Sequence, residues 1–285
     1  MTTVDSGLGL ALGELMPANE EEKKEAEERS APTGTVVYEA IYSEGESELG
    51  RSTRALLWSG LAAGLSMSFS FITMALIQSS LPNTKWRDLV VGMGYPVGFI
   101  IVILGRQQLF TENTLTVILP LLTKRTRETF LNVCRLWAAV LVANLIGALL
   151  VAFVLAKTEV VSPEAFASMR ELAKSPQQGA FSVVFLRGIF AGWLIALTVW
   201  LLPFAETARV WVIAIITYVI GIAHFSHVIA GAVEAAFLVI AGVSSWAEFA
   251  LGFFIPSLLG NIVGGVLLVA VLNHAQVVAG KAVDV

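Results

Sequence analysis

The sequence predicts an all-α membrane protein with six spanning helices, arranged as two inverted three-helix repeats in which the second and fifth helices are broken. Its 285 residues are 56% hydrophobic and 14% charged, with a mean hydropathy of +0.77. Soluble domains are nearer ~45–50% apolar and ~25% charged, so this apolar excess indicates burial in a bilayer. Two further observations support the arrangement: apolar stretches of spanning length, and short motifs that recur in the same order in each half.

A helix that crosses the ~30 Å hydrocarbon core needs about 20 mainly apolar residues. Six stretches meet this requirement, at 55–81, 88–122, 128–156, 180–204, 208–243 and 247–275. Residues 51–276 therefore form the predicted six-span domain. Residues 1–50 are predicted to be an acidic cytoplasmic tail, disordered or helical, and 277–285 a short cytoplasmic C-terminal tail.

The second and fifth stretches are too long for one straight helix, and polar residues interrupt both near their centres, at 105–113 and 221–227. We therefore expect each to be two half-helices joined by an irregular segment. A membrane protein tolerates such a segment only where it is buried in protein or lines a cavity.

The two halves of the chain resemble each other. A Gly-x-x-x-Gly motif at 60–64 recurs at 188–192, and the break at 110–111 is matched by one at 225–226. The glycine motif alone commonly serves helix packing, but the shared order indicates a repeat. Three spans per repeat is an odd number, so the second repeat is inverted, and paired broken helices point to a site at the bilayer midplane.

Charge sets the expected orientation and excludes some functions. Arg51 and Arg54 precede the first span, and a basic loop at 124–127 follows the second, so both termini should be cytoplasmic. The net charge of −4 gives no basic surface for nucleic acid, and the single Cys134 excludes a disulfide framework.

Ionisable residues at membrane depth are costly and usually functional. The candidates are Arg106, Glu112, Arg187, His224, His227 and Glu234. His227 is the best of them, because it begins a half-helix next to Ser226, a plausible N-cap. The N-termini of the half-helices, with their partial positive charge and free N–H groups, favour a small anion, to which His227 adds a proton or a charge. A purely structural histidine, bonded to a backbone carbonyl, is the alternative.

Bulky apolar residues flank this polar centre. Leu109, Phe110 and Phe225 either narrow a pore or pack the helices, and their spacing does not separate the two. Thr111 is a candidate both for capping the second half-helix and for contacting a solute, and Asn113 is a competing cap.

The remaining charged residues allow several roles. Glu112 would repel an anion, unless it pairs with His227 or Arg106 or points away from the pore. Glu234 follows His227 by two turns, on nearly the same helix face or near the outer mouth. Arg187 faces either the membrane edge or a buried carboxylate.

Three motifs carry a resemblance to a known family. Segment 108–111 (Gln-Leu-Phe-Thr) looks like a Glu-Leu-Phe-Thr loop, and 225–227 (Phe-Ser-His) looks like a Phe-Glu-His segment. Segment 187–189 (Arg-Gly-Ile), followed by Trp193, looks like a fourth-span motif of the same family. With these motifs in order over about residues 50–275, the chain resembles the formate/nitrite transporter family.

The resemblance implies an aquaporin-like fold, a homopentamer with one pore per protomer, and no enzymatic activity or cofactor. Such proteins lie in the bacterial inner membrane and pass small monovalent anions such as formate, nitrite, hydrosulfide, acetate or lactate, often with a proton. Carried over by position, His227 is the central pore histidine, Phe110 and Phe225 contribute to constrictions, and Thr111 belongs to the loop that faces His227.

Four positions depart from the family pattern. Gln108 stands where Glu is frequent, Glu112 where a small residue is usual, and Gly192 and Gly231 where Asn is usual. Together with the acidic tail, these changes resemble the YfdC-like branch of the family, so formate or nitrite is not assumed as the substrate.

The expected function is a passive channel or a proton-linked carrier for small anions of weak acids, in which His227 or water supplies the proton. A neutral-solute channel is the second reading, if Glu112 and His227 form a standing ion pair. A membrane metal carrier or metalloenzyme is the third, because His224 and His227 have i, i+3 spacing. Zinc sites need three or four ligands, however, so no metal site is assigned.

Overall fold

The computed structural model describes residues 19, 24, 32–174 and 179–281. Residues Gly34–Val285 form one compact unit, and Met1–Thr33 form another of which few residues are described. Most of the predicted acidic tail therefore lies outside the described residues, and the described helices belong to the unit that begins at Gly34, apart from an isolated helical position at Lys24.

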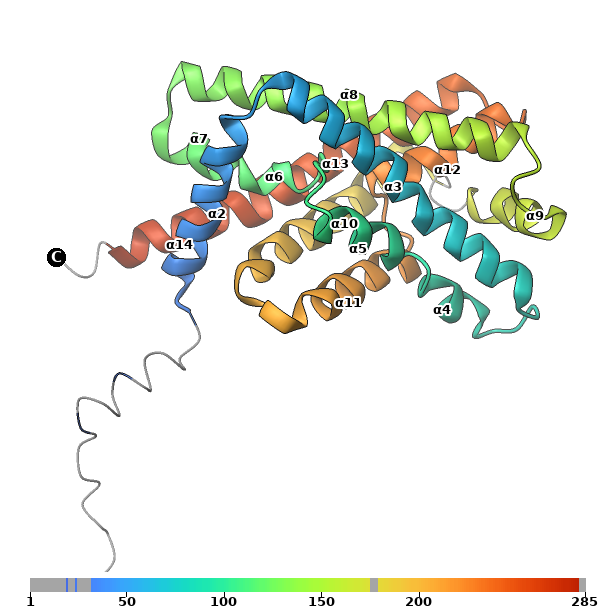
Figure 1. Cartoon of the computed structure of the whole chain (residues 1–285), viewed down its shortest axis with the longest axis horizontal. Helices are drawn as coiled ribbons and strands as arrows, with labels where there is room; N and C mark the ends of the chain where they lie inside the picture. Colours follow the sequence, from blue (N-terminus) through green and yellow to red (C-terminus); the bar gives the residue numbers. More distant parts are fainter. Residues whose placement is uncertain (1–18, 20–23, 25–31, 175–178, 282–285) are drawn as a thin grey trace, which may run out of the picture. The chain divides into compact units, whose positions relative to one another are not determined.

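This unit is built from helices throughout its described part (Figure 1). The α-helices are α2 (Gly34–Leu49), α3 (Thr53–Ser80), α4 (Arg87–Gly92), α5 (Pro96–Leu104), α6 (Asn113–Thr116), α7 (Ile118–Lys124), α8 (Arg127–Lys157), α9 (Pro163–Leu172), α10 (Phe181–Leu201), α11 (Arg209–Ile222), α12 (Val228–Ile240), α13 (Ile255–Gly265) and α14 (Leu272–Lys281). Short 3-10 helices η2 (Leu202–Phe204) and η3 (Glu206–Ala208) precede α11, and π-helical segments η4 (Glu248–Phe254) and η5 (Val266–Val271) flank α13.

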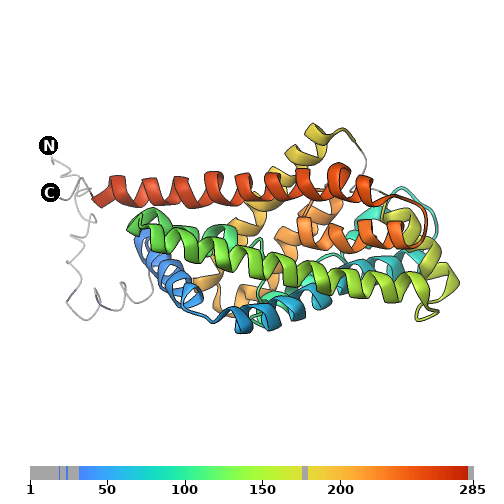
Figure 2. The same ribbon diagram turned by 90° about the horizontal axis from the view of Figure 1, so that it is seen from above.

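Five described helical segments are long and apolar enough to cross a membrane. They are Thr53–Ser80, Arg87–Leu104, Arg127–Lys157, Phe181–Phe204 and Glu248–Gly280. Figure 2 shows the last of these as one long helical rod. The shorter apolar helix α12 lies among them and is buried along most of its length.

Local sequence explains where the long helices begin and why they pack closely. The Ser52 hydroxyl accepts the Ala55 N–H at 3.3 Å and caps α3, and Thr126 caps α8 through the Thr129 N–H at 3.1 Å. Helices α3 and α8 lie side by side (Figure 1). A β-carbon on Gly64 would overlap the carbonyl oxygen of Asn144, so glycine allows the two backbones to touch.

The compact unit begins at α2, earlier than the boundary at residue 51 that the sequence predicts. Tyr38 and Ile41 are buried in the core, and the Tyr38 hydroxyl lies 2.9 Å from Thr123 Oγ1 and 2.7 Å from His274 Nδ1. At the other end, α14 continues to Lys281, through the first part of the predicted C-terminal tail. Residues 34–49 are therefore part of the packed structure.

Candidate functional site

Two non-helical segments interrupt the apolar helices. The first break, residues 105–112, separates α5 from α6, and the second break, residues 223–227, separates α11 from α12. The second residue of each break is a non-glycine residue in the left-handed region, Arg106 at φ 53° and His224 at φ 52°. The closing hydrogen bonds correspond, from Gln107 N–H to Val102 O at 3.0 Å and from Phe225 N–H to Ile220 O at 3.1 Å. This is the Schellman type of helix ending, and it turns the backbone in the same way at both places.

A buried asparagine holds the first break. The Asn144 side chain in α8 donates from Nδ2 to Gly60 O at 2.7 Å and to Gln108 O at 2.9 Å. Its Oδ1 accepts the Phe110 N–H at 2.9 Å. One fully buried amide thus satisfies a helix carbonyl and two groups of irregular backbone, which would otherwise be left unpaired in an apolar interior.

A second asparagine holds the second break with the same bonds. Asn261 in α13 donates from Nδ2 to Gly188 O and to Ser226 O, both at 2.8 Å, and its Oδ1 accepts the Val228 N–H at 2.9 Å. We call the two side chains, Asn144 and Asn261, the asparagine clamps. The sequence analysis missed them, although a lone amide within an apolar span was an available signal.

The clamps correct the expected correspondence between the two breaks. The sequence analysis matched Phe110 with Phe225. The bonds instead match Gln108 with Ser226, so that Phe110 corresponds to Val228. The similarity of the two Phe-containing dipeptides was therefore misleading, because the backbone and not the ring defines the equivalent positions.

The two breaks meet where Thr111 contacts His227. Thr111 Oγ1 lies 2.8 Å from His227 Nε2, and both side chains are buried. His227 Nδ1 accepts the Ala230 N–H at 3.2 Å and so caps α12. Because Nδ1 is an acceptor, the ring proton is on Nε2 and the imidazole is neutral in this arrangement. Phe99 packs edge-on against the ring, with centroids 5.0 Å apart.

This arrangement corrects the predicted caps. Ser226 does not cap α12, since His227 does, and the Ser226 hydroxyl has no hydrogen-bond partner among the described residues. The Thr111 hydroxyl contacts His227 and does not cap α6. Asn113 donates to Gln108 Oε1 at 3.0 Å and to Leu109 O at 3.1 Å, so it acts as a donor that braces the first break.

Apolar residues stand close to Thr111 and His227 along the chain. Leu109 and Phe110 are fully buried, and the Phe110 ring packs edge-on against Trp137 at 5.5 Å. Phe225 is half-buried and stacks on Phe190 at 5.2 Å. These rings make ordinary packing contacts, so their predicted role in narrowing a pore stays a prediction.

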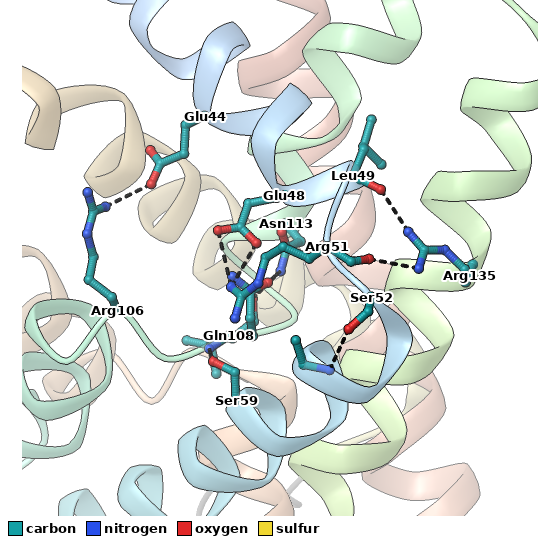
Figure 3. A network of polar contacts seen from close by, with 12 residues as sticks. Glu44, Glu48, Leu49, Arg51, Ser52, Ser59, Arg106, Gln108, Asn113 and Arg135 are labelled. Atoms are coloured by element: carbon teal, nitrogen blue, oxygen red, sulfur yellow. Dashed lines mark hydrogen bonds and ion pairs between the residues drawn. The ribbon is translucent and has the colours of Figure 1, made fainter.

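A large cavity, which we call the α2 cavity, lies beside the first break. Its volume is about 770 Å³, and Glu112, Gln108 and residues of α2 line it. In Figure 3 Arg106 reaches Glu44, at 2.8 Å, and Glu48 binds Arg51 at 2.9 Å. Glu112 Oε1 is buried and has no hydrogen-bond partner among the described residues. Among the described residues Glu112 forms no bond with His227 or Arg106, and the alternative that it points away from the pore stays a prediction.

A small cavity of about 50 Å³, the α4 cavity, lies beside the second break. His227, His224, Glu234, Tyr95 and Asp88 contribute to its lining. Glu234 thus shares a cavity with His227, as the spacing of two turns indicated.

The α2 and α4 cavities lie at opposite ends of two helices. The C-terminal residue Leu104 of α5 lines the α2 cavity, and Tyr95, just before α5, lines the α4 cavity. Similarly, Arg209 and Ile220 place the two ends of α11 at different cavities. The Thr111–His227 contact lies between them, because His227 lines one cavity and Glu112, next to Thr111, lines the other.

Two predicted residues lie elsewhere. A β-carbon on Gly192 would overlap the carbonyl oxygen of Asn261, so Gly192 lies at the crossing of α10 with α13. Arg187 is half-buried on α10. The described residues also contain no group of three or more His, Cys, Asp or Glu side chains able to hold a metal. The alternative of a metal carrier or metalloenzyme therefore has no ligand set in this part of the chain.

Comparisons with known proteins agree with this architecture. The sequence profile of the formate/nitrite transporter family matches residues 35–275. Inner membrane protein YfdC of Escherichia coli (strain K12) is 37% identical over 251 residues, which cover 88% of this chain and 81% of that protein. Formate channel BtFdhC of Bacillus thuringiensis is 24% identical over 238 residues, covering 80% of this chain and 89% of that protein.

Solved structures show the same fold. A pentameric formate channel with formate bound superimposes with a TM-score of 0.68 at 19% identity, covering 79% of this chain and 98% of that chain. A second structure, an FNT family ion channel, gives a TM-score of 0.71 at 18% identity, with 83% and 97% covered. The match over nearly the whole compact unit confirms the resemblance seen in the motifs: this chain is a multi-pass membrane channel protein and belongs to the formate/nitrite transporter family.

Proposed function

We propose that the chain forms a six-span channel of two inverted repeats, which passes small monovalent anions of weak acids together with a proton at the Thr111–His227 contact. The observation that carries the proposal is the 2.8 Å contact between these two side chains, at the point where the breaks meet between two cavities. An N–H and a hydroxyl that now bind each other are the donors that a passing anion needs.

The donors in this proposal are side chains more than backbone groups. Asn261 and His227 already accept two of the first N–H groups of α12, those of Val228 and Ala230. What α12 retains for an anion is the partial positive charge of its N-terminus. We therefore assign the hydrogen bonds to the solute to His227 Nε2–H and the Thr111 hydroxyl, which exchange their mutual bond for bonds to the anion.

The apolar surroundings explain why a proton accompanies the anion. An isolated anion loses much hydration energy among side chains such as Leu109, Phe110 and Phe99. Adding a proton converts it into a neutral acid for which this cost is small. Proton linkage is thus the expected way for a weak acid to cross the buried layer around His227.

Assembly and location are part of the same proposal. We infer a homopentamer in the bacterial inner membrane, with both termini cytoplasmic. Apolar side chains that are exposed along α8, such as Val142, Leu150 and Phe153, need lipid or another copy to cover them. The pentameric formate channel and the inner membrane protein YfdC are similar to this chain and support these assignments.

The test is uptake of radiolabelled formate by proteoliposomes at two pH values, for wild type, His227→Phe and His227→Asn. Asn retains an acceptor that can cap α12, whereas Phe does not. If the imidazole binds the solute, both variants lose acid-stimulated uptake, and only Phe also lowers the melting temperature. Wild-type uptake in both variants would show that His227 has a structural role only.

A neutral-solute channel is the second candidate, because an unpaired carboxyl, Glu112 or Glu234, lines the cavity on each side of His227. Two carboxylates along the path disfavour a bare anion. Voltage-independent uptake of urea, without uptake of formate, would favour this candidate.

A further inference from the structure

The α4 cavity contains a carboxyl group that the proposed function does not yet use. Glu234 is 3% exposed, and within the described chain no hydrogen bond or ion pair joins its carboxyl group to another residue. It lies seven residues after His227 on α12, about two turns or ~10 Å along the helix. Both side chains line the same cavity.

The elements packed around Glu234 supply several ionisable groups. Those that line the cavity with it are Asp88, Tyr95, His224 and His227. Glu171 on α9, beside the lining residue Leu172, accepts a hydrogen bond from Gln78 of α3 at 2.8 Å. Arg187 of α10 is near enough to His224 for its positive charge to interact with the imidazole. The lining residues of α3 and α11, Met74 and Ile220, are not ionisable, and neither is Phe253 of η4, which packs on α12. Among the described residues no Lys or Arg lines the cavity, so Glu234 has no cationic partner there.

A change of protonation would break a hydrogen bond at His227 but not at Glu234. His227 Nδ1 accepts the Ala230 N–H, so a proton added there removes the cap of α12. The neutral ring can donate a hydrogen bond through Nε2, but it has no acidic proton to give away. The carboxyl of Glu234 makes no such bond, so it can take up or release a proton without disrupting a contact.

We propose that Glu234 is the residue that exchanges a proton with the transported weak acid, while His227 stays neutral and orients the anion. The O–H bond of the protonated Glu234 carboxyl breaks as its proton passes through water in the α4 cavity, and an O–H bond forms on the anion at His227, giving the neutral acid and a Glu234 carboxylate. A hydronium ion from the water on the α4 side then restores the carboxyl, so one proton moves with each anion. This inference rests on the proposed function and identifies Glu234 as the group that donates the proton.

The experiment compares acid-stimulated uptake of radiolabelled formate into proteoliposomes containing full-length wild type, Glu234→Gln and Glu234→Asp. Glu164→Gln is the matched control, because it removes a carboxylate from the exposed start of α9, outside both cavities. We expect loss of the acid stimulation in Glu234→Gln, its retention in Glu234→Asp with a changed pH profile, and wild-type behaviour in the control. Wild-type acid stimulation in a folded Glu234→Gln protein overturns the proposal.

A second measurement separates this inference from the proposed function. Infrared difference spectra of the purified protein between two pH values should contain a protonated-carboxyl band that Glu234→Gln abolishes and Glu164→Gln retains. Absence of uptake of formate, acetate and lactate by the wild type would refute the proposed function, and the infrared result would still decide whether Glu234 exchanges protons. If the Gln variant leaves the carboxyl bands unchanged, Glu234 does not titrate and the inference fails.

Discussion

In the first break Asn144 binds the backbone of Gln108 and Phe110, and in the second Asn261 binds that of Ser226 and Val228. The bond lengths agree closely, from 2.8 to 2.9 Å. The residue between the two held positions differs, since Leu109 stands in one break and His227 in the other. The two breaks therefore share their backbone support, and they differ in the side chain at the middle position, which is apolar in the first break and an imidazole in the second.

The breaks also differ in length, eight residues in the first and five in the second. The additional residues of the first break include Thr111 and Glu112. Thr111 reaches across to His227, and Glu112 lines the α2 cavity. A symmetric scaffold thus becomes an asymmetric site through one side-chain exchange and one longer segment.

The largest expected effect comes from removing a clamp. Asn144→Ala or Asn261→Ala leaves one carbonyl and one N–H of the break unpaired, while the helix carbonyl keeps its bond within the helix. Each buried unpaired group costs about 1–3 kcal/mol, so we expect each variant to lose at least about 2 kcal/mol of unfolding free energy. Thermal unfolding in detergent, followed by the loss of monodisperse protein, measures this. A large difference between the two variants would show that the two breaks are not equally supported.

The next effect concerns the helix crossings in each half. Gly64→Ala and Gly192→Ala place a β-carbon against the carbonyl oxygens of Asn144 and Asn261. Overpacking of this kind costs about 1–3 kcal/mol, so both variants should melt at lower temperature. Gly252→Ala is the control, because nothing lies within 4 Å of its β-carbon position. Equal melting of all three variants would contradict the close packing at the crossings.

A smaller effect tests the contact that joins the breaks. Thr111→Val keeps the shape but leaves the buried His227 Nε2–H without its 2.8 Å partner, which costs about 1–3 kcal/mol for this single group. We expect a smaller fall in melting temperature than in the clamp variants, and impaired formate uptake, with Thr111→Ser restoring it. If Val and Ser transport equally well, the hydroxyl does not contact the solute.

The smallest effect is expected at the mouth of the α2 cavity. The Arg106 and Glu44 side chains are 77% and 41% exposed, and such surface ion pairs contribute about 0–1 kcal/mol. Glu44→Gln should therefore leave the unfolding temperature unchanged within error, at low and at high salt. A clear loss of stability would mean that α2 depends on this pair for its position.

The sequence predicted the apolar helices better than the hydrogen bonds that hold the two breaks. Apolar length alone located the long helices, and the polar residues within 105–113 and 221–227 located both breaks. The asparagine clamps lie far along the chain from the groups that they bind, so the lone amides in the apolar spans were visible but their partners were not. The predicted pairing of Phe110 with Phe225 was wrong for the same reason. The repeated Phe is visible in the sequence, whereas the repeated hydrogen bonds are not.

Composition also concealed the role of α2. Four Glu residues in Gly34–Leu49 give this helix the character of a solvated tail. Its buried side, with Tyr38, Ile41 and Leu49, is short and interrupted, and its packing against α7, α14 and other helices shows that it belongs to the compact unit. The prediction therefore followed the Glu residues of the exposed side and assigned this helix to the acidic tail.

The asparagine clamps also have a consequence for how the chain tolerates mutation. Positions in the two breaks that receive the same bonds are 118 residues apart, as Gln108 and Ser226 are. A complete substitution scan should therefore produce similar tolerance profiles at paired positions wherever the backbone alone sets the requirement. Leu109 and His227 form the pair at which the profiles should diverge most, and that divergence would separate selection for transport from selection for folding without reference to any homologue.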